Sequence, residues 1–135
     1  MSRSSSLKRM VLPVIFLSFL AGCSMVTVQS QPYLGVPTYA PTNPAQVEIL
    51  RTEPTRPNVR LGEISLEPQD HPPVSEIEEK LRTAAAKMGA NAAVIVADKT
   101  KIIGAWVTGP WWARQADPIY GRVIIAIAIR YTPTP

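Results

Sequence analysis

The sequence predicts an α+β fold in which one helix packs on a mostly antiparallel sheet. Three observations support this prediction: runs of strand-like apolar residues, one amphipathic segment over about residues 74–89, and short turn-rich links between them. Because a single helix leaves most strands adjacent along the chain, neighbouring strands are expected to pair antiparallel. The expected element order is β-β-α-β-β-β.

Two strands are expected before the helix. Residues 47–51 (VEILR) alternate apolar and polar side chains, and residues 59–67 (VRLGEISLE) do so again after a turn-rich link. The alternation slips around Gly62. This predicts a bulge or bend there, because glycine inside a strand often marks such irregularities.

The helix carries the clearest local signals. Ser75 and Glu78 have the spacing of a capping box, and Gly89 suits the position just beyond a helix end. Apolar residues at helical spacing predict one shallow buried face: Ile77, Leu81, Ala84, Ala85 and Met88. Acidic residues crowd the expected first turn and are interpreted as partners of the helix dipole rather than as a carboxylate site: Glu76, Glu78 and Glu79.

Three strands are expected after the helix, over residues 92–98, 102–109 and 122–131, with a turn at the KTK sequence between the first two. The last strand is the longest and is apolar on both faces, which favours a covered, central position in the sheet. Residues 109–121 are predicted to form a loop, and residues 132–135 a short tail.

The N-terminus has the layout of a secretory signal. Basic residues precede an apolar run over residues 11–20, which is too short to span a bilayer because a spanning helix needs about 20 residues. The LAGC string at residues 20–23 resembles the bacterial lipobox. That resemblance implies that residues 1–22 are removed and that Cys23 carries covalent lipid, palmitate included. An incidental cysteine in an ordinary signal and an uncleaved membrane anchor are the alternatives.

The residue after the lipobox bears on the membrane reached. In Gram-negative lipoproteins an aspartate there resembles an inner-membrane retention mark, whereas this chain has Ser24. Ser24 therefore favours the outer membrane, on the assumption of a Gram-negative host. Residues 23–45 hold four prolines and no charge, and are expected to form an extended spacer reaching roughly 60 Å in polyproline II form. The folded domain is expected over residues 46–131.

Composition and motifs exclude several kinds of chemistry. Loss of the signal removes three basic residues from a formal net charge of +4, so the mature chain is nearly neutral and unlike a nucleic-acid-binding protein. Acylation of the single cysteine removes thiol chemistry and cysteine metal sites. No phosphate loop, nucleophile elbow or zinc motif occurs. Neither a catalytic residue nor a cofactor or metal site is therefore predicted, and the protein is not expected to be an enzyme.

Residues 81–98 (LRTAAAKMGANAAVIVAD) resemble a helix–turn–strand motif of small bacterial envelope families. These are the Rcs stress-sensor outer-membrane lipoprotein, related lipoproteins, and an envelope family named for heavy-metal binding. The resemblance spans residues 47–131 and includes the Leu-Gly-x-Ile string at residues 61–64 and the small-residue apolar strand at 123–131. It implies the α+β fold. The Rcs sensor resembles a disulfide-bonded protein, whereas this chain has no cysteine pair, so partner identity is not carried over.

Residues 109–121 (GPWWARQADPIYG) have the composition of a binding hot spot, with Trp111, Trp112, Arg114 and Tyr120 in a connection longer than a hairpin needs. One interpretation is that they bind a partner or the membrane. The other is that both tryptophan rings fold back and plug the open end of the sheet. Adjacent residues of an extended segment point opposite ways, which would bury one ring and expose the other.

The predicted function is that of a membrane-anchored, non-enzymatic envelope lipoprotein that interacts with or senses another envelope component. Its expected partners are the lipid bilayer, through Cys23, and an unidentified envelope protein. The alternative is an envelope protein that binds a small molecule or metal ion in a pocket gathering Asp70, His71 and Asp117. Asp70 and His71 alone lack the further ligands or the nucleophile of a metal or catalytic site, and are interpreted as a solvated loop pair.

Overall fold

The computed structural model describes residues 25–133, so the predicted signal peptide, Cys23 and Ser24 lie outside the described residues. The elements follow in chain order: β1 (Val26–Pro32), the 3₁₀ helix η1 (Pro44–Gln46), β2 (Glu48–Leu50), β3 (Asn58–Pro68), α1 (Val74–Lys87), β4 (Ala92–Thr108) and β5 (Gln115–Tyr131). Within this range, neither helix is long and apolar enough to cross a membrane.

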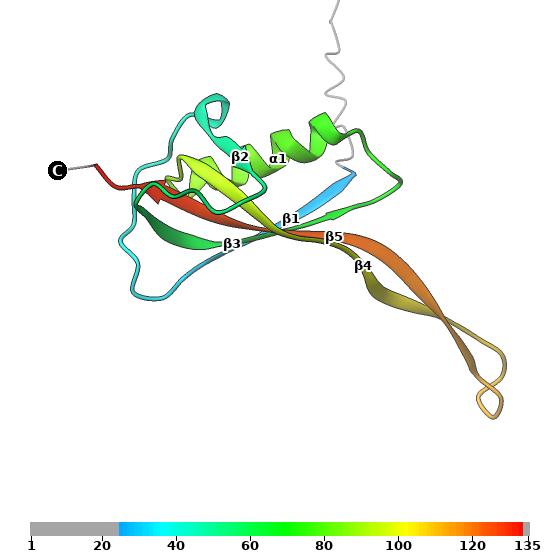
Figure 1. Cartoon of the computed structure of the whole chain (residues 1–135). Helices are drawn as coiled ribbons and strands as arrows, with labels where there is room; N and C mark the ends of the chain where they lie inside the picture. The colour runs from blue at the N-terminus through cyan, green and yellow to red at the C-terminus, as the bar shows by residue number, and fades with distance from the viewer. Residues whose placement is uncertain (1–24, 134–135) are drawn as a thin grey trace, which may run out of the picture.

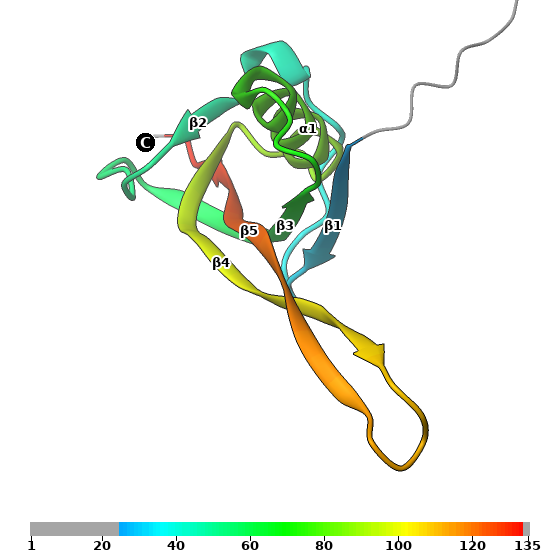
Figure 2. The ribbon, with the colours of Figure 1, turned by 90° about the vertical axis from the view of Figure 1, so that its right-hand side faces the viewer.

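One five-stranded sheet with the order β1-β3-β5-β4-β2 forms the body, and α1 lies across one of its faces (Figures 1 and 2). The predicted α+β fold is confirmed, with one helix on a mostly antiparallel sheet. The sheet is nevertheless mixed, because β2 pairs parallel with β4 while the other described neighbours pair antiparallel. The predicted element order is wrong: three strands precede the helix and two follow it.

The two long strands differ most from the prediction. The expected strands at 92–98 and 102–109 form the single strand β4, so the predicted KTK turn is strand, and residues 115–121 of the predicted loop belong to β5. One antiparallel ladder joins them, from Ala92 opposite Ile129 to Thr108 opposite Gln115, with register shifts that absorb the slips in alternation. The pairing of β4 with β5 therefore overrides the local turn signal at KTK. The two strands are neighbours along the chain, and this proximity favours their pairing.

The predicted spacer is folded over residues 26–45. Val26–Pro32 is an edge strand antiparallel to β3, and Val26 is buried in the core. Farther along, Tyr39 packs against the core with the Arg130 guanidinium 4.6 Å from its ring centroid, and the Thr42 amide donates to the Ala86 carbonyl at 2.9 Å. The spacer prediction is wrong here. Prolines lack a backbone N–H, but Pro32 ends a strand and the later prolines lie in a segment that crosses outside the sheet, so no hydrogen bond of the sheet is lost.

The core lies between α1 and the sheet. The predicted helix face is confirmed: Ile77, Leu81, Ala84 and Ala85 are buried, and the half-buried Met88 packs against the same cluster. Alanines on both sides of the contact, such as Ala85 on α1 and Ala126 on β5, let helix and sheet approach closely. Ile64 and Leu66 of β3 are fully buried beside them.

The C-terminal end of the helix is as predicted, but the N-terminal end is not. The N-cap is Pro73, whose backbone is extended and which makes no side-chain cap, so the capping box at Ser75 is wrong and Ser75 lies within the first turn. The helix begins at Val74, two residues earlier than an N-cap at Ser75 would allow, and the extended backbone of Pro73 immediately precedes it. Glu76 is the acidic residue of the first turn, while Glu78 pairs with Arg82 at 3.8 Å. The predicted C-terminal role of Gly89 is confirmed by its φ of 79°.

Gly62 lies at the predicted bulge, where the β3–β5 register shifts between Arg60 and Gly62. A Cβ at this position would collide with the Gln31 carbonyl oxygen and the Met88 Cε, and would lie 2.8 Å from the Pro32 Cα. The absence of a side chain at Gly62 therefore lets β1, β3 and the end of α1 meet.

Gly62→Ala should lower the free energy of unfolding by about 1–3 kcal/mol, because an added methyl overpacks this contact. Chemical denaturation measures the effect. Gly104→Ala is the control, since a Cβ there would lie 3.7 Å from the Ile119 Cδ1 in ordinary contact. Equal losses for the two variants would contradict the packing argument.

Candidate functional site

The main candidate site is a two-stranded arm, which we define as residues 99–122. Both strands run on beyond the sheet there, because β3 pairs with β5 only as far as Ile124, and no other described strand pairs with the continuing ribbon. Figures 1 and 2 show the arm projecting well away from the body. Pro118 is tolerated within β5 because the strand is an edge strand in the arm.

The tip of the arm carries the predicted tryptophan pair. Gly109, with a φ of 93°, opens the turn, and the Ala113 amide donates to the Pro110 carbonyl at 3.0 Å, which places Trp111 and Trp112 at the corner. Their rings meet edge to face with centroids 5.5 Å apart, and the residues are 78% and 70% exposed. The plug interpretation is therefore wrong, as is the expectation that one ring is buried.

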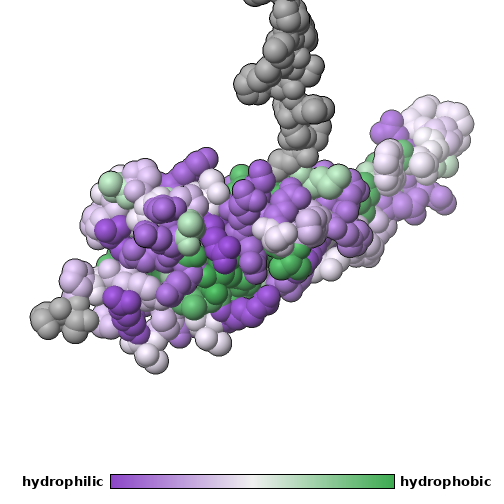
Figure 3. All heavy atoms as spheres, turned by 90° about the horizontal axis from the view of Figure 1, so that it is seen from above, coloured by the Kyte–Doolittle hydropathy of each residue, from purple (hydrophilic) through white to green (hydrophobic). Residues whose placement is uncertain are grey.

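The rest of the arm also exposes large apolar residues: Ile102, Ile103, Trp106, Val107 and Tyr120. Figure 3 shows hydrophobic atoms among hydrophilic ones along it. Of the residues predicted as a binding loop, Tyr120 is exposed in strand β5 near the root of the arm, and Arg114 is exposed at the end of the turn. The arm thus separates Tyr120 from the tryptophans that the sequence grouped with it.

Strand register divides the arm into two faces. Ile102 lies opposite Tyr120, Ala105 opposite Pro118, and Val107 opposite Ala116. Because residues directly opposite each other share a face, these six form what we call the apolar face: Ile102, Ala105, Val107, Ala116, Pro118 and Tyr120. The other face carries Lys101, Trp106, Thr108, Gln115, Asp117 and Ile119. The arm is therefore a ribbon with one wholly apolar face and a second face, which we call the polar face, where four polar residues lie beside Trp106 and Ile119.

Ion pairs fasten the root of the arm to the body. The Arg122 guanidinium donates to both carboxylate oxygens of Asp98, at 2.8 and 2.6 Å, and Lys101 Nζ lies 3.8 Å from Glu67 Oε1 of β3. The hydrogen bonds from Arg122 lower the pKa of Asp98, and the same pair raises the pKa of Arg122. The root is thus held by charge, while the outer arm has only its own ladder.

A cleft of about 450 Å³ lies beside the root, lined by the segment Pro68–Pro72 together with Ile103, Tyr120 and Arg122. Asp70 and His71 both adopt a left-handed backbone with φ of 53°. The structure brings these two residues together with Tyr120 and Arg122, but Asp117 does not line the cleft. Among the described residues, no group of three or more His, Cys, Asp or Glu side chains is placed to hold a metal ion.

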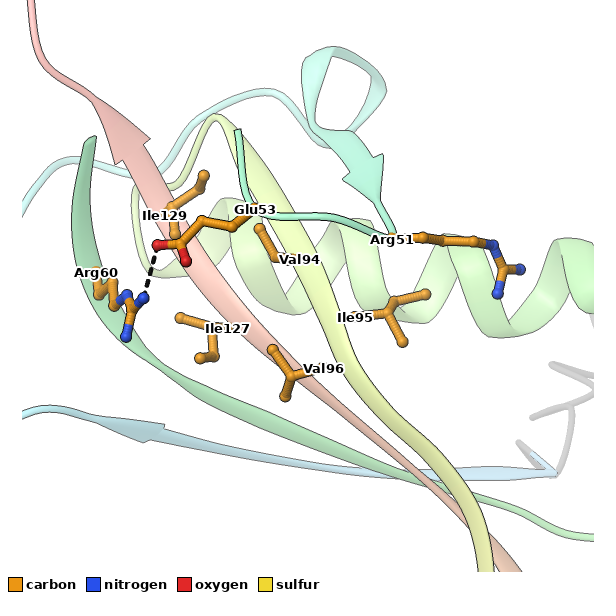
Figure 4. Close-up of a pocket in the computed structure, with 8 residues that line it drawn as sticks. All are labelled: Arg51, Glu53, Arg60, Val94, Ile95, Val96, Ile127 and Ile129. Carbon is orange, nitrogen blue, oxygen red and sulfur yellow. Dashed lines mark hydrogen bonds and ion pairs between the residues drawn. The ribbon is translucent and has the colours of Figure 1, made fainter. Parts of the chain in front are cut away.

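A second cavity, of about 240 Å³, lies on the sheet face that α1 leaves uncovered (Figure 4). Val94, Ile127 and Ile129 form its apolar floor, and the Glu53–Arg60 ion pair, 2.6 Å long, crosses its rim. Ligand pockets for drug-sized molecules start at about 300 Å³, so this space suits only a very small ligand. Sequence analysis missed it because nothing in the local pattern predicts that residues 51–57 cross this face.

No protein-family model, curated protein sequence or solved structure matches this chain. The resemblance of residues 47–131 to small envelope families therefore stays a prediction. The geometry of the arm and of the two cavities carries the functional argument.

The double variant Trp111→Ser/Trp112→Ser should fold as stably as the parent, with a change in unfolding free energy within about 0.5 kcal/mol, because exposed side chains contribute little to the folded state. Thermal and chemical unfolding measure this. Leu66→Ala, a fully buried change on β3, is the contrasting control and should cost about 2–5 kcal/mol. A comparable loss in the tip variant would restore the plug interpretation.

Asp98→Asn should reduce the dependence of stability on acid. The pKa of Asp98 is lowered from its ordinary value of 3.8, so its pairing with Arg122 stabilises the fold at neutral pH and is lost as the pH falls through the lowered pKa. We expect a contribution of about 0.2–1 kcal/mol for this partly exposed pair. The difference between the unfolding free energies measured at neutral pH and below the pKa should be smaller for the variant than for the parent, and an unchanged difference would contradict the assignment. Asp117→Asn, on the exposed arm, is the matched control.

Proposed function

We propose that this protein is a non-enzymatic envelope lipoprotein, anchored in the outer membrane through lipid on Cys23, whose arm engages another component of the envelope. The observation that carries this proposal is the arm itself. Its apolar face and tip expose aromatic and branched side chains that the packed body does not use. Contiguous exposed apolar surface of this kind is typical of interaction sites.

The arm is also expected to be only marginally stable in a molecule that has no partner. A two-stranded hairpin is at best marginally stable in water, since it needs a third strand or a packed face. In residues 99–122 neither is present, because β3 ends its pairing at Ile124 and α1 covers only the body (Figure 1). A partner that covers the apolar face would supply the missing burial. Tryptophan, tyrosine and arginine are the residues most often found at the energetic centre of such contacts.

The lipid anchor is supported by the charge pattern, apolar run and LAGC string that end at Cys23. Each buried CH₂ of an acyl chain contributes about 0.8 kcal/mol, and two or more chains hold a protein firmly on a bilayer. β1 begins at Val26, three residues after Cys23. The anchored domain would therefore stand directly on the membrane surface rather than roughly 60 Å away on a spacer.

The cleft beside the root favours a second candidate function, the binding of a small molecule. It places Arg122 and Tyr120 beside Asp70 and His71, whose left-handed backbones are unusual for residues other than glycine. Thermal melts with panels of small anions and divalent metals test this, because a ligand of the native state raises the melting temperature. A shift that His71→Ala removes would support it, and the absence of any shift would count against it.

Cys23→Ala should abolish acylation and release the protein from membranes, because no other cysteine can accept the lipid. Mass analysis of the purified product and membrane fractionation measure the two effects. Ser24→Ala is the control and should leave the lipid in place. A Cys23→Ala protein that still carried lipid would overturn the anchor.

A photo-cross-linker at position 112 should capture envelope components in cells, because Trp112 lies exposed at the tip of the arm. The matched control is a cross-linker at position 34, where Leu34 is even more exposed than Trp112 but follows the opposite end of β1. Adducts specific to position 112 support contact through the arm. The same adducts from both positions would contradict it.

A further inference from the structure

We infer that the component engaged by the arm is the bilayer itself: the apolar face and the tip tryptophans lie in the headgroup region of the membrane that holds Cys23. This inference rests on the proposed lipid anchor and specifies what the arm contacts. It is supported by the place where the described chain enters the fold, by the composition of the arm, and by the strand register that gives the arm two different faces.

The chain enters the fold beside the root of the arm. The Met25 carbonyl accepts from the Gln69 amide at 2.7 Å, and Val26 lies opposite Pro68 in the β1–β3 ladder. Pro68 and Gln69 line the same cleft as Ile103 and Tyr120 of the arm. The described chain therefore begins at the end of the sheet from which the arm projects, as the start of β1 shows in Figure 1.

Chain length then limits how far the arm can be from the membrane. Val26 is three positions after Cys23, with Ser24 and Met25 between them, and a fully extended chain spans at most about 3.5 Å per residue, which gives about 10 Å. The arm strand from Lys99 to Thr108 is about 30 Å long at about 3.3 Å per residue. The root of the arm is thus held close to the headgroups, and the arm is long enough to lie along them.

The composition of the arm suits a lipid surface. The chain has three tryptophans, at positions 106, 111 and 112, and all lie in the arm. Tryptophan and tyrosine are enriched at the membrane–water interface. The arm also carries four basic residues and one acidic residue: Lys99, Lys101, Arg114, Arg122 and Asp117. Lys101 and Arg122 pair with Glu67 and Asp98, so Lys99 and Arg114 are the basic residues offered to anionic headgroups. Each basic residue near the surface contributes about fivefold in binding, the equivalent of about 1 kcal/mol.

The register predicts how the arm lies. The apolar face would turn toward the hydrocarbon, and the face with Lys101, Thr108 and Asp117 toward water. Lysine side chains on that face can still reach the headgroups. Trp106 shares the polar face, so it should lie shallower than Trp111 and Trp112. A lipid surface needs no complementary shape, which suits a twisted ribbon exposed along its length.

Intrinsic fluorescence tests the inference directly, since every tryptophan of the chain reports on the arm. The acylated full chain, purified from bacterial membranes, is reconstituted into vesicles of phosphatidylethanolamine with phosphatidylglycerol as the anionic component. Brominated lipids should quench the emission, and acrylamide should quench it less than it quenches the unacylated Cys23→Ala variant free in solution. Variants that keep one tryptophan and replace the other two with Phe should show at least twofold stronger lipid quenching at position 111 or 112 than at position 106.

Val107→Asp and Thr108→Asp form the matched pair for the two faces. The positions are adjacent, both are exposed, and they lie on the apolar and polar faces respectively. Lipid quenching should fall several-fold for Val107→Asp and little for Thr108→Asp, with unfolding curves to show that both variants fold. Equal effects of the two substitutions would overturn the assigned orientation.

The remaining outcomes separate this inference from the proposed function. An acylated protein whose tryptophans ignore brominated lipid overturns the bilayer contact and leaves the lipoprotein proposal intact. If raising the protein concentration shields the tryptophans from acrylamide while brominated lipid does not quench them, the arm contacts a second copy of the chain. If cross-linkers in the arm capture a protein while brominated lipid does not quench the tryptophans, the arm contacts a protein partner. If the chain proves unacylated, the proposed anchor fails. The same vesicles added to that chain then test the arm alone: quenching keeps the bilayer contact, and its absence overturns it.

Discussion

The antiparallel ladder between β4 and β5 is the contact on which the rest of the structure depends. Each strand is 17 residues long, and they stay paired from the centre of the sheet to the tip of the arm. In the body β5 also pairs with β3, which in turn holds β1, and β4 holds β2. Because β5 joins both halves of the sheet, a break in its pairing with β4 would detach the arm and one sheet edge together.

The same two strands meet very different surroundings along their length. In the body, Ile124, Ala126 and Ala128 of β5 are buried against α1, and Ile129 is buried on the opposite face near the segment that leads from β2 to β3. Beyond the root of the arm, nothing described covers either face. Continuity of backbone hydrogen bonds thus extends a well-packed strand into a region where its apolar side chains are exposed. The arm therefore exposes apolar surface that is available for contact with a partner.

The folding of residues 26–45 changes the expected relation between the domain and a membrane. As a spacer, this segment would place the domain far from a lipid at Cys23. As β1 and a crossing segment tied to α1 through Thr42, it forms one edge of the sheet and leaves two residues between Cys23 and Val26. The arm starts from the same end of the sheet as this short link to Cys23. Both belong to one proposed arrangement, in which the arm and the acyl chains contact the same bilayer.

Local chemistry made the helix, its buried face and the residue that ends it predictable, because a 3.6-residue period and a glycine with positive φ are properties of adjacent residues. The bulge at Gly62 was also visible in the sequence, as was the choice of Trp111 and Trp112 as candidate binding residues, but the exposure of both rings was not. Only the tertiary structure decided that residues 26–32 form a strand, that β2 pairs parallel with β4, and that residues 99–101 and 115–121 continue strands rather than turn. Strand pairing joins residues distant in the sequence, and a partner can override a weak local turn signal. For the same reason, the amphipathic faces of the arm became apparent only once its register was known.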